Sequence, residues 1–256
     1  MKHYSGLEIR QIFHIEFLRA FSRKFKPQLY ALKGGVNLRL FFKSIRYSED
    51  MDMDVKNIDK ITLRDSVMKI IASAQLRNEL RPFGIRDIRV PDMAKAKQTD
   101  TTQRFKVHLL TDSNEDLFSK IEFSRRGMSG GRAVEHVPEG ILREYRVSPF
   151  LTSHYDAETA VRQKIGALAD RSVVQARDIF DLHVLSTQCA NSAGAVKAPE
   201  STVKKACENL FSVEFRQFRD TVLAYLEPED RAAYDNPGAW DEIKLKVNEM
   251  ICLRHQ

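Results

Sequence analysis

The chain has 256 residues, of which 43% are apolar, so it can bury a sizeable core and we expect a globular protein. Its formal net charge of +6 suggests an anionic partner such as nucleic acid or phosphate, although many basic proteins bind neither. No apolar run approaches the roughly 20 residues that span a bilayer, and the first residues show no signal peptide. We therefore expect a soluble cytoplasmic protein without a membrane partner.

The first predicted element is a helix over residues 7–25. An apolar residue recurs at every fourth position, and Pro27 ends the pattern. The stripe consists of Ile9, Phe13, Phe17, Phe21 and Phe25. One apolar stripe along a helix predicts packing against a core rather than a functional site.

A strand, a glycine pair and a helix are predicted next. The segment QLYALK, residues 28–33, reads as a short buried strand that runs into Gly34 and Gly35. Residues 36–45 then favour a helix or a helical turn. A tight glycine turn before a helix allows backbone N–H groups to approach a phosphate.

The rest of the first half mixes a helix with strands. Residues 62–80 have helical periodicity, and three strand-like segments follow it. In the second and third of these strands apolar residues alternate with polar ones, which predicts a hairpin or meander. The strands are expected at 84–90, 103–111 and 118–126, and loops at 91–101 and 126–140.

From about Asp156 the pattern changes to long helical segments. They are expected at 157–171, 173–188, 200–226 and 239–253. A mixed half followed by a helical half predicts two domains, residues 1–150 and 151–256.

Negative charge is concentrated in the stretch RYSEDMDMDV, residues 46–55. It follows a segment, residues 1–46, with ten Lys or Arg and two acids, a local charge of +8. In a strand, Asp50, Asp52 and Asp54 project from one face. Paired carboxylates of this kind can hold Mg²⁺ or Mn²⁺, which prefer oxygen ligands. The alternative interpretation of such a pattern is a solvated acidic strand or turn.

The joined string LKGGVNLRLFFKSIRYSEDMDMDV resembles the signature of the AbiEii/AbiGii toxin family of nucleotidyltransferases. That signature is a Gly-Gly-Thr turn, a short helix, and then Arg-x-Ser-x-Asp-x-Asp. Arg46, Ser48, Asp50 and Asp52 fall on the pattern in order. Val36 departs from it, because it stands where the family usually has a hydroxyl residue.

A second block, QKIGALADRSVVQARDIFDLHVL, resembles the later motif of the same family, a Lys-x-x-Ala-Leu helix followed by Arg-Asp-x-x-Asp-Leu. Helical spacing places Lys164 and Arg171 on one face, and Asp178 and Asp181 on one face of the next helix. The two pairs are expected to converge. Taken alone, the block also fits an ordinary helical hairpin with salt bridges.

The resemblance implies an α+β fold: a nucleotidyltransferase-type mixed sheet with flanking helices, and a helical C-terminal domain that completes the active site. It implies an enzyme that transfers a nucleoside monophosphate from an NTP to an acceptor such as RNA, notably a tRNA end, while a protein or a small molecule stays open as the acceptor. It also implies Mg²⁺ or Mn²⁺ as cofactor, and a toxin whose partner is a cognate antitoxin.

The resemblance also implies the roles of individual residues. Asp50 and Asp52 would bind the metal, with Glu122 as a third carboxylate from a neighbouring strand. The nucleotide-binding residues would be Gly34, Gly35, Arg46, Ser48 and Lys164. Lys164 would also act in catalysis, and Asp181, with Asp178 as the alternative, would orient it or help to activate the acceptor.

Two other functions stay open from the sequence. One is a catalytically silent module on the same fold that binds nucleic acid or a protein partner, with Val36 as the first sign of decay. The other is a metal-dependent nuclease, which would also use clustered carboxylates but leaves the glycine pair unexplained.

Overall fold

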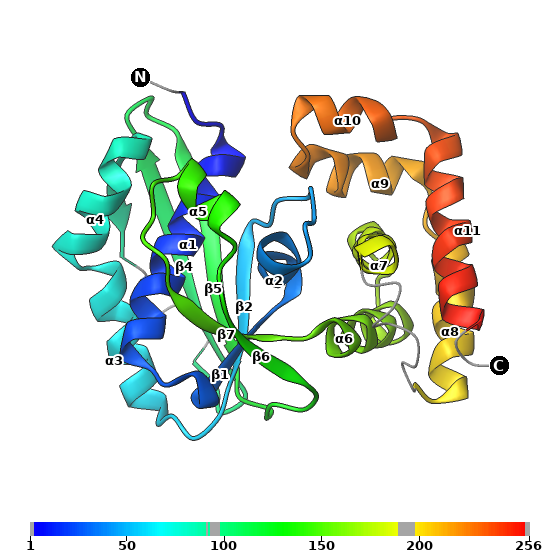
Figure 1. Cartoon of the computed structure of the whole chain (residues 1–256), viewed down its shortest axis with the longest axis horizontal. Coiled ribbons are helices and arrows are strands. Elements are labelled where there is room, and N and C mark those ends of the chain that lie inside the picture. The colour runs from blue at the N-terminus through cyan, green and yellow to red at the C-terminus, as the bar shows by residue number, and fades with distance from the viewer. Residues whose placement is uncertain (1–2, 91, 93–97, 189–197, 254–256) are drawn as a thin grey trace. The chain divides into compact units, whose positions relative to one another are not determined.

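The computed structural model describes residues 3–90, 92, 98–188 and 198–253 (Figure 1). Two compact units make up the chain. The first consists of Met1–Leu40 and Tyr47–Tyr155, and the second of Phe41–Arg46 and Asp156–Gln256. Among the described residues, no helix has both the length and the apolar character needed to cross a membrane.

Within the described residues, the first unit contains one seven-stranded sheet in the order β3-β4-β5-β2-β1-β7-β6. The strands are β1 Tyr30–Lys33, β2 Asp50–Val55, β3 Ile85–Arg89, β4 Thr102–Thr111, β5 Asp116–Ser124, β6 Arg132–His136 and β7 Leu151–Tyr155. The pairs β2–β5 and β1–β7 are parallel and the others antiparallel, so the predicted mixed sheet is confirmed.

Helices lie on both faces of this sheet. Their bounds are α1 Gly6–Lys24, α2 Gly34–Phe41, α3 Lys60–Ile71, α4 Ala74–Leu80 and α5 Glu139–Glu144, with 3₁₀ turns at Pro27–Leu29 and Arg81–Phe83. Helices α1, α3 and α4 cover one face, and α2 lies on the other (Figure 1). The sheet therefore has one thickly covered face and one face on which polar side chains can gather.

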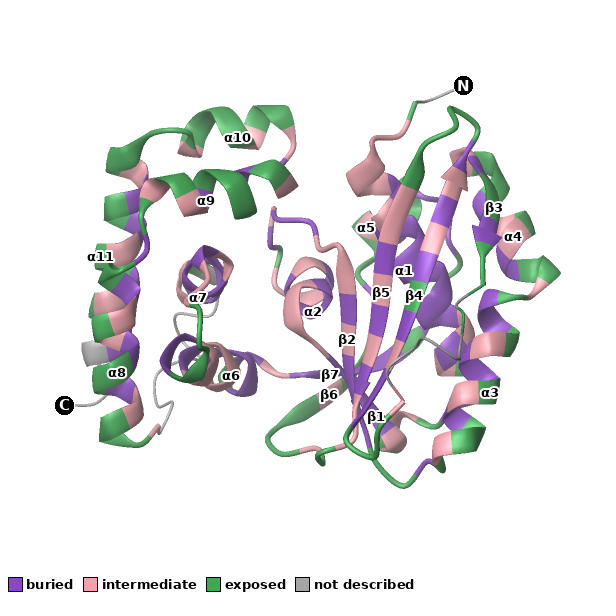
Figure 2. Cartoon of the chain, turned by 180° about the vertical axis from the view of Figure 1, so that it is seen from behind, coloured by how far each residue is buried: buried purple, intermediate pink, exposed green. Residues whose placement is uncertain are grey.

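The core lies between the sheet and α1. The predicted stripe of α1 is confirmed, because the side chains of Phe13, Phe17 and Phe21 have no exposed surface. In Figure 2 much of α1 has the purple colour of buried residues. The Phe21 ring lies 5.1 Å from that of Tyr30 and 5.4 Å from that of Phe123 in β5. Helix α1 thus closes the apolar face of the strands at the centre of the sheet.

The alternation predicted for the strands is also confirmed. Strands β4 and β5 pair as an antiparallel hairpin, and Phe105 and Phe123 are fully buried on its apolar face. Met51 and Met53 of β2 are likewise 0% exposed. Because neighbouring residues of a strand point to opposite faces, the aspartates between them belong to the polar face.

Two predictions in the first unit are wrong. The helix expected at 62–80 is divided into α3 and α4, because the Ser73 hydroxyl accepts a hydrogen bond from the Leu76 N–H and starts a new helix. The loop expected at 126–140 contains the edge strand β6, whose residues are mostly exposed and lack an apolar face. Most of the loop expected at 91–101 lies outside the described residues.

The second unit is helical, as predicted. Its elements are α6 Ala157–Asp170, α7 Ala176–Gln188, α8 Glu200–Phe211, α9 Phe215–Thr221, a 3₁₀ turn at Leu223–Tyr225, α10 Pro228–Tyr234 and α11 Pro237–Leu253. The prediction of a single helix over 200–226 is wrong, because the helix ends after α8 and a new one, α9, begins at Phe215. Trp240 fixes the break: its ring stacks on Phe218 at 4.4 Å, and its Nε1–H donates to the Val213 carbonyl.

The packing of α1 predicts that Phe21→Ala lowers the free energy of unfolding by about 3–5 kcal/mol, because it removes a fully buried ring from the central contact. Urea unfolding of the full chain measures the change. Phe211→Ala is the matched control, since that ring is 51% exposed, and it should change stability by less than about 0.5 kcal/mol. Equal losses in both variants would contradict this account of the core.

Candidate functional site

The glycine turn after β1 is shaped by its contact with β2. Gly34 has a φ of +67°, which favours glycine, and an added Cβ would lie 3.0 Å from Oδ2 of Asp52. Any side chain here would press on that carboxylate. The turn therefore brings the start of α2 directly against Asp52.

Strand pairing decides what surrounds Asp52. On one side its register partner is Lys33 of β1, and on the other it is Glu122 of β5. Asp50 is opposite Lys120 in the same way. Three of the predicted site residues, Asp50, Asp52 and Glu122, are thus brought to neighbouring positions on one face.

The pKa of Asp52 is raised above its usual value. Burial is the largest cause, because it disfavours the charged carboxylate. The nearby Lys33 lowers the pKa, while the carboxylates of Glu122 and Asp50 raise it. Negative charge is therefore concentrated here at some cost, as in a site built to receive a cation.

Basic side chains hold the other carboxylates on this face. Lys120 Nζ lies 2.6 Å from Asp50 Oδ2, and Arg104 Nη2 lies 2.6 Å from Glu122 Oε2. Asp54 accepts hydrogen bonds from Lys33 Nζ at 2.6 Å and from the Tyr155 hydroxyl at 2.7 Å. Asp54, the third aspartate of the cluster, is thus fully engaged.

The first two aspartates, Asp50 and Asp52, have carboxylate oxygens without hydrogen-bond partners among the described residues. Asp50 Oδ1 is buried and has no hydrogen-bond partner, and Asp52 forms no hydrogen bond or ion pair with any residue that the structure describes. Carboxylate oxygens without partners suit Mg²⁺ or Mn²⁺, so Asp50 and Asp52 fit such an ion. No three His, Cys, Asp or Glu side chains in the described part of the chain are gathered closely enough to hold a metal, so Glu122 stays a predicted ligand.

Ser48 fixes the start of β2. Its hydroxyl donates a hydrogen bond of 2.8 Å to the backbone carbonyl of Asp50. The serine of the Arg-x-Ser-x-Asp-x-Asp motif therefore holds the backbone from which the first aspartate projects.

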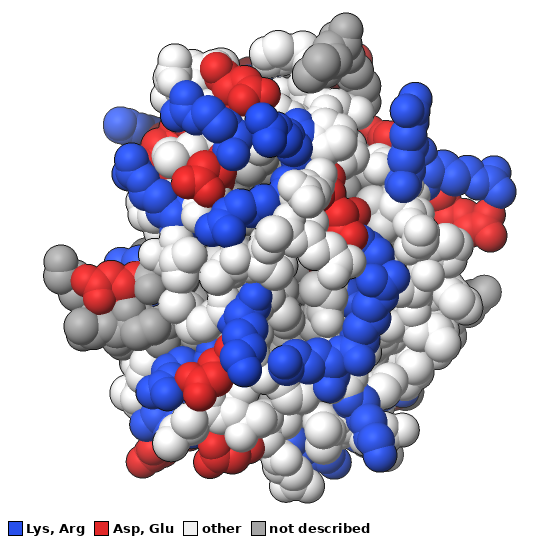
Figure 3. Space-filling view, turned by 90° about the vertical axis from the view of Figure 1, so that its left-hand side faces the viewer, with Lys and Arg blue, Asp and Glu red and all other residues white. Residues whose placement is uncertain are grey.

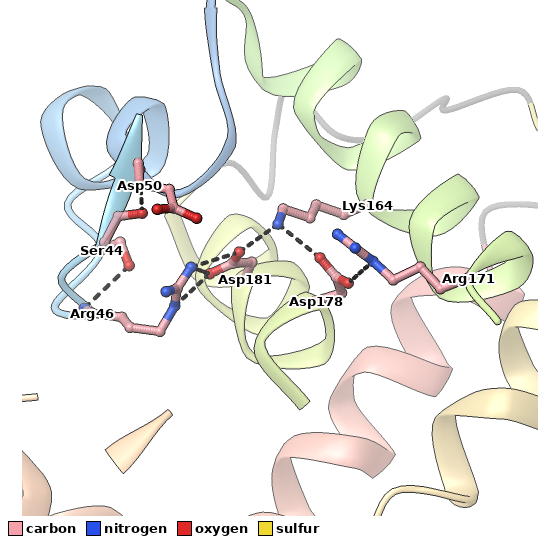
Figure 4. A network of polar contacts seen from close by, with 8 residues as sticks. Ser44, Arg46, Asp50, Lys164, Arg171, Asp178 and Asp181 are labelled. Atoms are coloured by element: carbon pink, nitrogen blue, oxygen red, sulfur yellow. Dashed lines mark hydrogen bonds and ion pairs between the residues drawn. The ribbon is translucent and has the colours of Figure 1, made fainter. Parts of the chain in front are cut away.

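The second unit holds the other predicted residues in a buried ionic network (Figure 4). Lys164 Nζ lies 2.9 Å from Asp178 Oδ1 and 2.6 Å from Asp181 Oδ2, and both aspartates are 0% exposed. Arg171 contacts Asp178 at 2.7 Å, and Arg46 donates three hydrogen bonds to Asp181. The predicted convergence of the two residue pairs is confirmed.

This network fixes the charge of its members. Burial works against the charge on Lys164, but Asp181 and Asp178 outweigh it and raise the pKa of the ammonium. Burial likewise opposes the charge on Asp181, yet Arg46 and Lys164 lower its pKa. Lys164 is thus a fixed positive charge rather than a proton acceptor, and Asp181 is an ionised group that orients it.

Several contacts of the site were missed from the sequence. Arg46 was assigned to the nucleotide, but its guanidinium is bound to Asp181, so the nucleotide contact stays a prediction. Lys33, Lys120 and Arg104 were not singled out. Their signal is strand register: each lies opposite an acidic residue on a neighbouring strand, which the sequence shows only once the pairing is known.

The turn predicts different effects at two glycines with positive φ. Gly34→Ala and Gly84→Ala should each cost about 1 kcal/mol of stability, because alanine disfavours their backbone angles. Gly34→Ala should cost more, because its added Cβ would meet Asp52, whereas no atom of the described residues lies within 4 Å of an added Cβ at Gly84. Urea unfolding of both variants tests this, and equal losses would contradict the contact.

The raised pKa of Asp52 predicts a pH-dependent effect of Asp52→Asn. A carboxyl whose folded-state pKa lies above its usual 3.8 costs folding free energy when it ionises. That cost is absent below pH 3.8 and complete above the folded-state pKa. The variant should therefore be more stable than the original protein at neutral pH and not at the acidic end.

Urea unfolding across this pH range measures the difference. Asp100→Asn controls for the substitution itself, because the Asp100 side chain is 97% exposed. A loss of stability in Asp52→Asn at neutral pH would contradict the electrostatic reading of the site.

The geometry agrees with comparisons to known proteins. The family described as "Nucleotidyl transferase AbiEii toxin, Type IV TA system" matches residues 16–242. No curated protein matches the sequence. A protein from Helicobacter pylori assigned as a nucleotidyltransferase has a similar structure, with a TM-score of 0.61 and 22% identity over 98% of this chain and 96% of that one.

MenT4, a nucleotidyltransferase toxin from Mycobacterium tuberculosis, has a TM-score of 0.61 and 14% identity over 98% of this chain and 84% of its own. At these identities the two structures establish the nucleotidyltransferase fold, which confirms the predicted fold class. The family match extends over both sequence motifs and most of the chain. The chain belongs to the AbiEii family of nucleotidyltransferase toxins of type IV toxin–antitoxin systems.

Proposed function

We propose that this protein transfers a nucleoside monophosphate from an NTP to an acceptor hydroxyl, with release of pyrophosphate. One observation carries the proposal: Asp50 and Asp52, on one face of β2 beside a glycine turn, keep oxygens without partners among the described residues. The glycine turn suits a phosphate, and the open oxygens suit a divalent ion.

Asp50 and Asp52 would hold Mg²⁺ or Mn²⁺, with Glu122 as the third candidate ligand. The ion, when bound, neutralises phosphate charge and lowers the pKa of an attacking hydroxyl. The protein contributes the rigid face on which the two aspartates stand, because Met51 and Met53 anchor the same strand in the core.

The backbone of Gly34 and Gly35 would bind the phosphates. Val36, which replaces the usual hydroxyl residue, is only 4% exposed and packs into the protein. Phosphate contacts at this turn would therefore come from the N–H groups at the start of α2. This reading accommodates Val36 without loss of the site.

Lys164 would balance negative charge on the phosphates. Its ammonium is held by Asp178 and Asp181, which fixes both its position and its charge. Asp181 acts here as a positioning residue. This role for Lys164 rests on the family motif and on the charge state that its surroundings impose.

We propose RNA, such as a tRNA end, as the acceptor, and a cognate antitoxin as the protein that counters the activity. Figure 3 shows many Lys and Arg side chains, interspersed with Asp and Glu, on one face of the first unit. Exposed Arg23, Lys24 and Lys69 line a groove of about 280 Å³ formed by α1, α3 and α4. Phosphate-backbone contacts require such residues.

The test is Mg²⁺-dependent transfer of label from each of the four NTPs into total RNA and total protein. We expect label in RNA, and a loss of at least about 100-fold in Asp50→Ala and Lys164→Ala, because both remove charge on which transition-state stabilisation depends. Label in protein alone would change the acceptor and leave the transfer reaction in place.

Two control variants make the losses specific. Asp100→Ala and Lys205→Ala remove the same side chains at exposed positions, and full activity is expected in both. Transfer at full rate without Asp50 would refute the assigned site. The absence of any transfer would favour a silent binding module, and RNA shortened without NTP would favour a nuclease.

A further inference from the structure

The face of the sheet that carries the aspartates is balanced in charge. Around Asp50 and Asp52, strand register and alternation place four cationic and four anionic side chains on this face. The cations are Lys33, Arg104, Lys106 and Lys120, and the anions are Asp50, Asp52, Asp54 and Glu122. A site meant only to attract metal ions would not need so many cations.

Two of these cations form ion pairs with carboxylates that are candidate metal ligands. Lys120 holds Asp50 at 2.6 Å, and Arg104 holds Glu122 at 2.6 Å. Both pairs are partly exposed: the Lys120 and Asp50 side chains are each 23% accessible. The pairs can therefore open without unpacking the core.

A divalent ion and the Lys120 ammonium compete for the same carboxylate. Asp50 Oδ1 is buried and has no hydrogen-bond partner among the described residues, so it can bind an ion that enters when the partly exposed Lys120–Asp50 pair opens. An ion held by Asp50 would offset the negative charge that holds Lys120 and would repel its ammonium. Metal binding thus weakens the Lys120–Asp50 pair and frees a cation on the same face.

The phosphates of a nucleotide bring new negative charge to this face. The Lys120 ammonium stands on a flexible four-carbon stem, so it can leave Asp50 and pair with a nearby phosphate oxygen. Arg104 can do the same with its guanidinium, which suits phosphate geometry. The same two cations would then pair with the carboxylates when the site is empty and with the phosphates when a nucleotide is bound.

We propose that Lys120, assisted by Arg104, is an exchangeable counter-ion: a divalent metal displaces it from Asp50, and it then binds the nucleotide phosphates. This inference rests on the proposed function and assigns to that site a phosphate-binding residue outside both sequence motifs. Metal and nucleotide would consequently bind cooperatively, since each favours the state in which Lys120 has left Asp50.

A fixed role for Lys120 makes the opposite prediction. If it only orients Asp50 for the metal, its removal should weaken metal binding, as the loss of a group that orients a ligand does. If it is an exchangeable counter-ion, its removal should strengthen metal binding, because a competitor is gone. The sign of one measurement separates the two.

The experiment measures Mn²⁺ binding to the full chain without nucleotide, by calorimetry or electron paramagnetic resonance. Lys120→Gln should bind Mn²⁺ more tightly, on the order of tenfold, within the range of coupling between linked ligands. Lys120→Met serves as a second variant without polar atoms. Lys106→Gln is the matched control, because it removes the same charge from the same face but forms no ion pair with a described carboxylate.

The second arm titrates the preformed Mn²⁺ complex of inorganic triphosphate, which all NTPs share. Here Lys120→Gln should bind several-fold more weakly than the original protein. Opposite signs in the two arms support the exchange. Weaker or unchanged Mn²⁺ binding in both Lys120 variants overturns it, as does an equal gain in Lys106→Gln.

Asp52→Asn distinguishes this failure from failure of the proposed function. If the original protein binds Mn²⁺ and Asp52→Asn does not, the metal site stands whatever Lys120 does. If the original protein binds no Mn²⁺, the proposed function fails, and the exchange fails with it.

Discussion

The pairing of β2 between β1 and β5 is the constraint on which the site depends. It places Asp52 between Lys33 and Glu122, and Asp50 opposite Lys120. A shift of one residue in either pairing would turn the aspartates toward the core and the methionines toward the polar face. The complete burial of Met51 and Met53 makes such a shift costly, so the core itself fixes the position of the carboxylates.

In the second unit, ionic contacts rather than apolar packing fix the positions of the site residues. The fully buried Asp181 stays ionised because Arg46 and Lys164 surround it and lower its pKa. The equally buried Asp178 contacts Lys164 and Arg171. Such a network contributes little net stability compared with apolar packing, but it fixes geometry. Loss of one member would leave a buried charge without a partner, so the position and charge of Lys164 are protected together.

Local patterns in the sequence were sufficient for much of the fold. The stripe of α1 and the alternation of β2, β4 and β5 are periodic over enough residues to identify the element and its buried face. The edge strand β6 was missed because it is mostly exposed, and the break before α4 was missed because one serine starts a new helix inside a periodic segment.

The residues of the site likewise fall into those that a local pattern predicts and those that it does not. Asp50 and Asp52 lie two residues apart, and a short motif identified them. Lys120 and Lys33 became visible only through strand register, and the partners Arg46 and Asp181 are 135 residues apart. Contacts of this kind depend on the whole topology, so no local pattern can reveal them.

The cations of the polar face explain how a concentration of carboxylates is tolerated in the folded chain. Without them, neighbouring anions on β2 and β5 would repel one another in a partly buried place. The compensation is incomplete at Asp52, whose pKa stays raised by burial despite the nearby Lys33. An ion that binds Asp52 would relieve this cost only in the folded state, so its binding and the stability of the sheet are linked. Ionised Asp52 thus weakens the fold at neutral pH, and a bound cation would offset that cost.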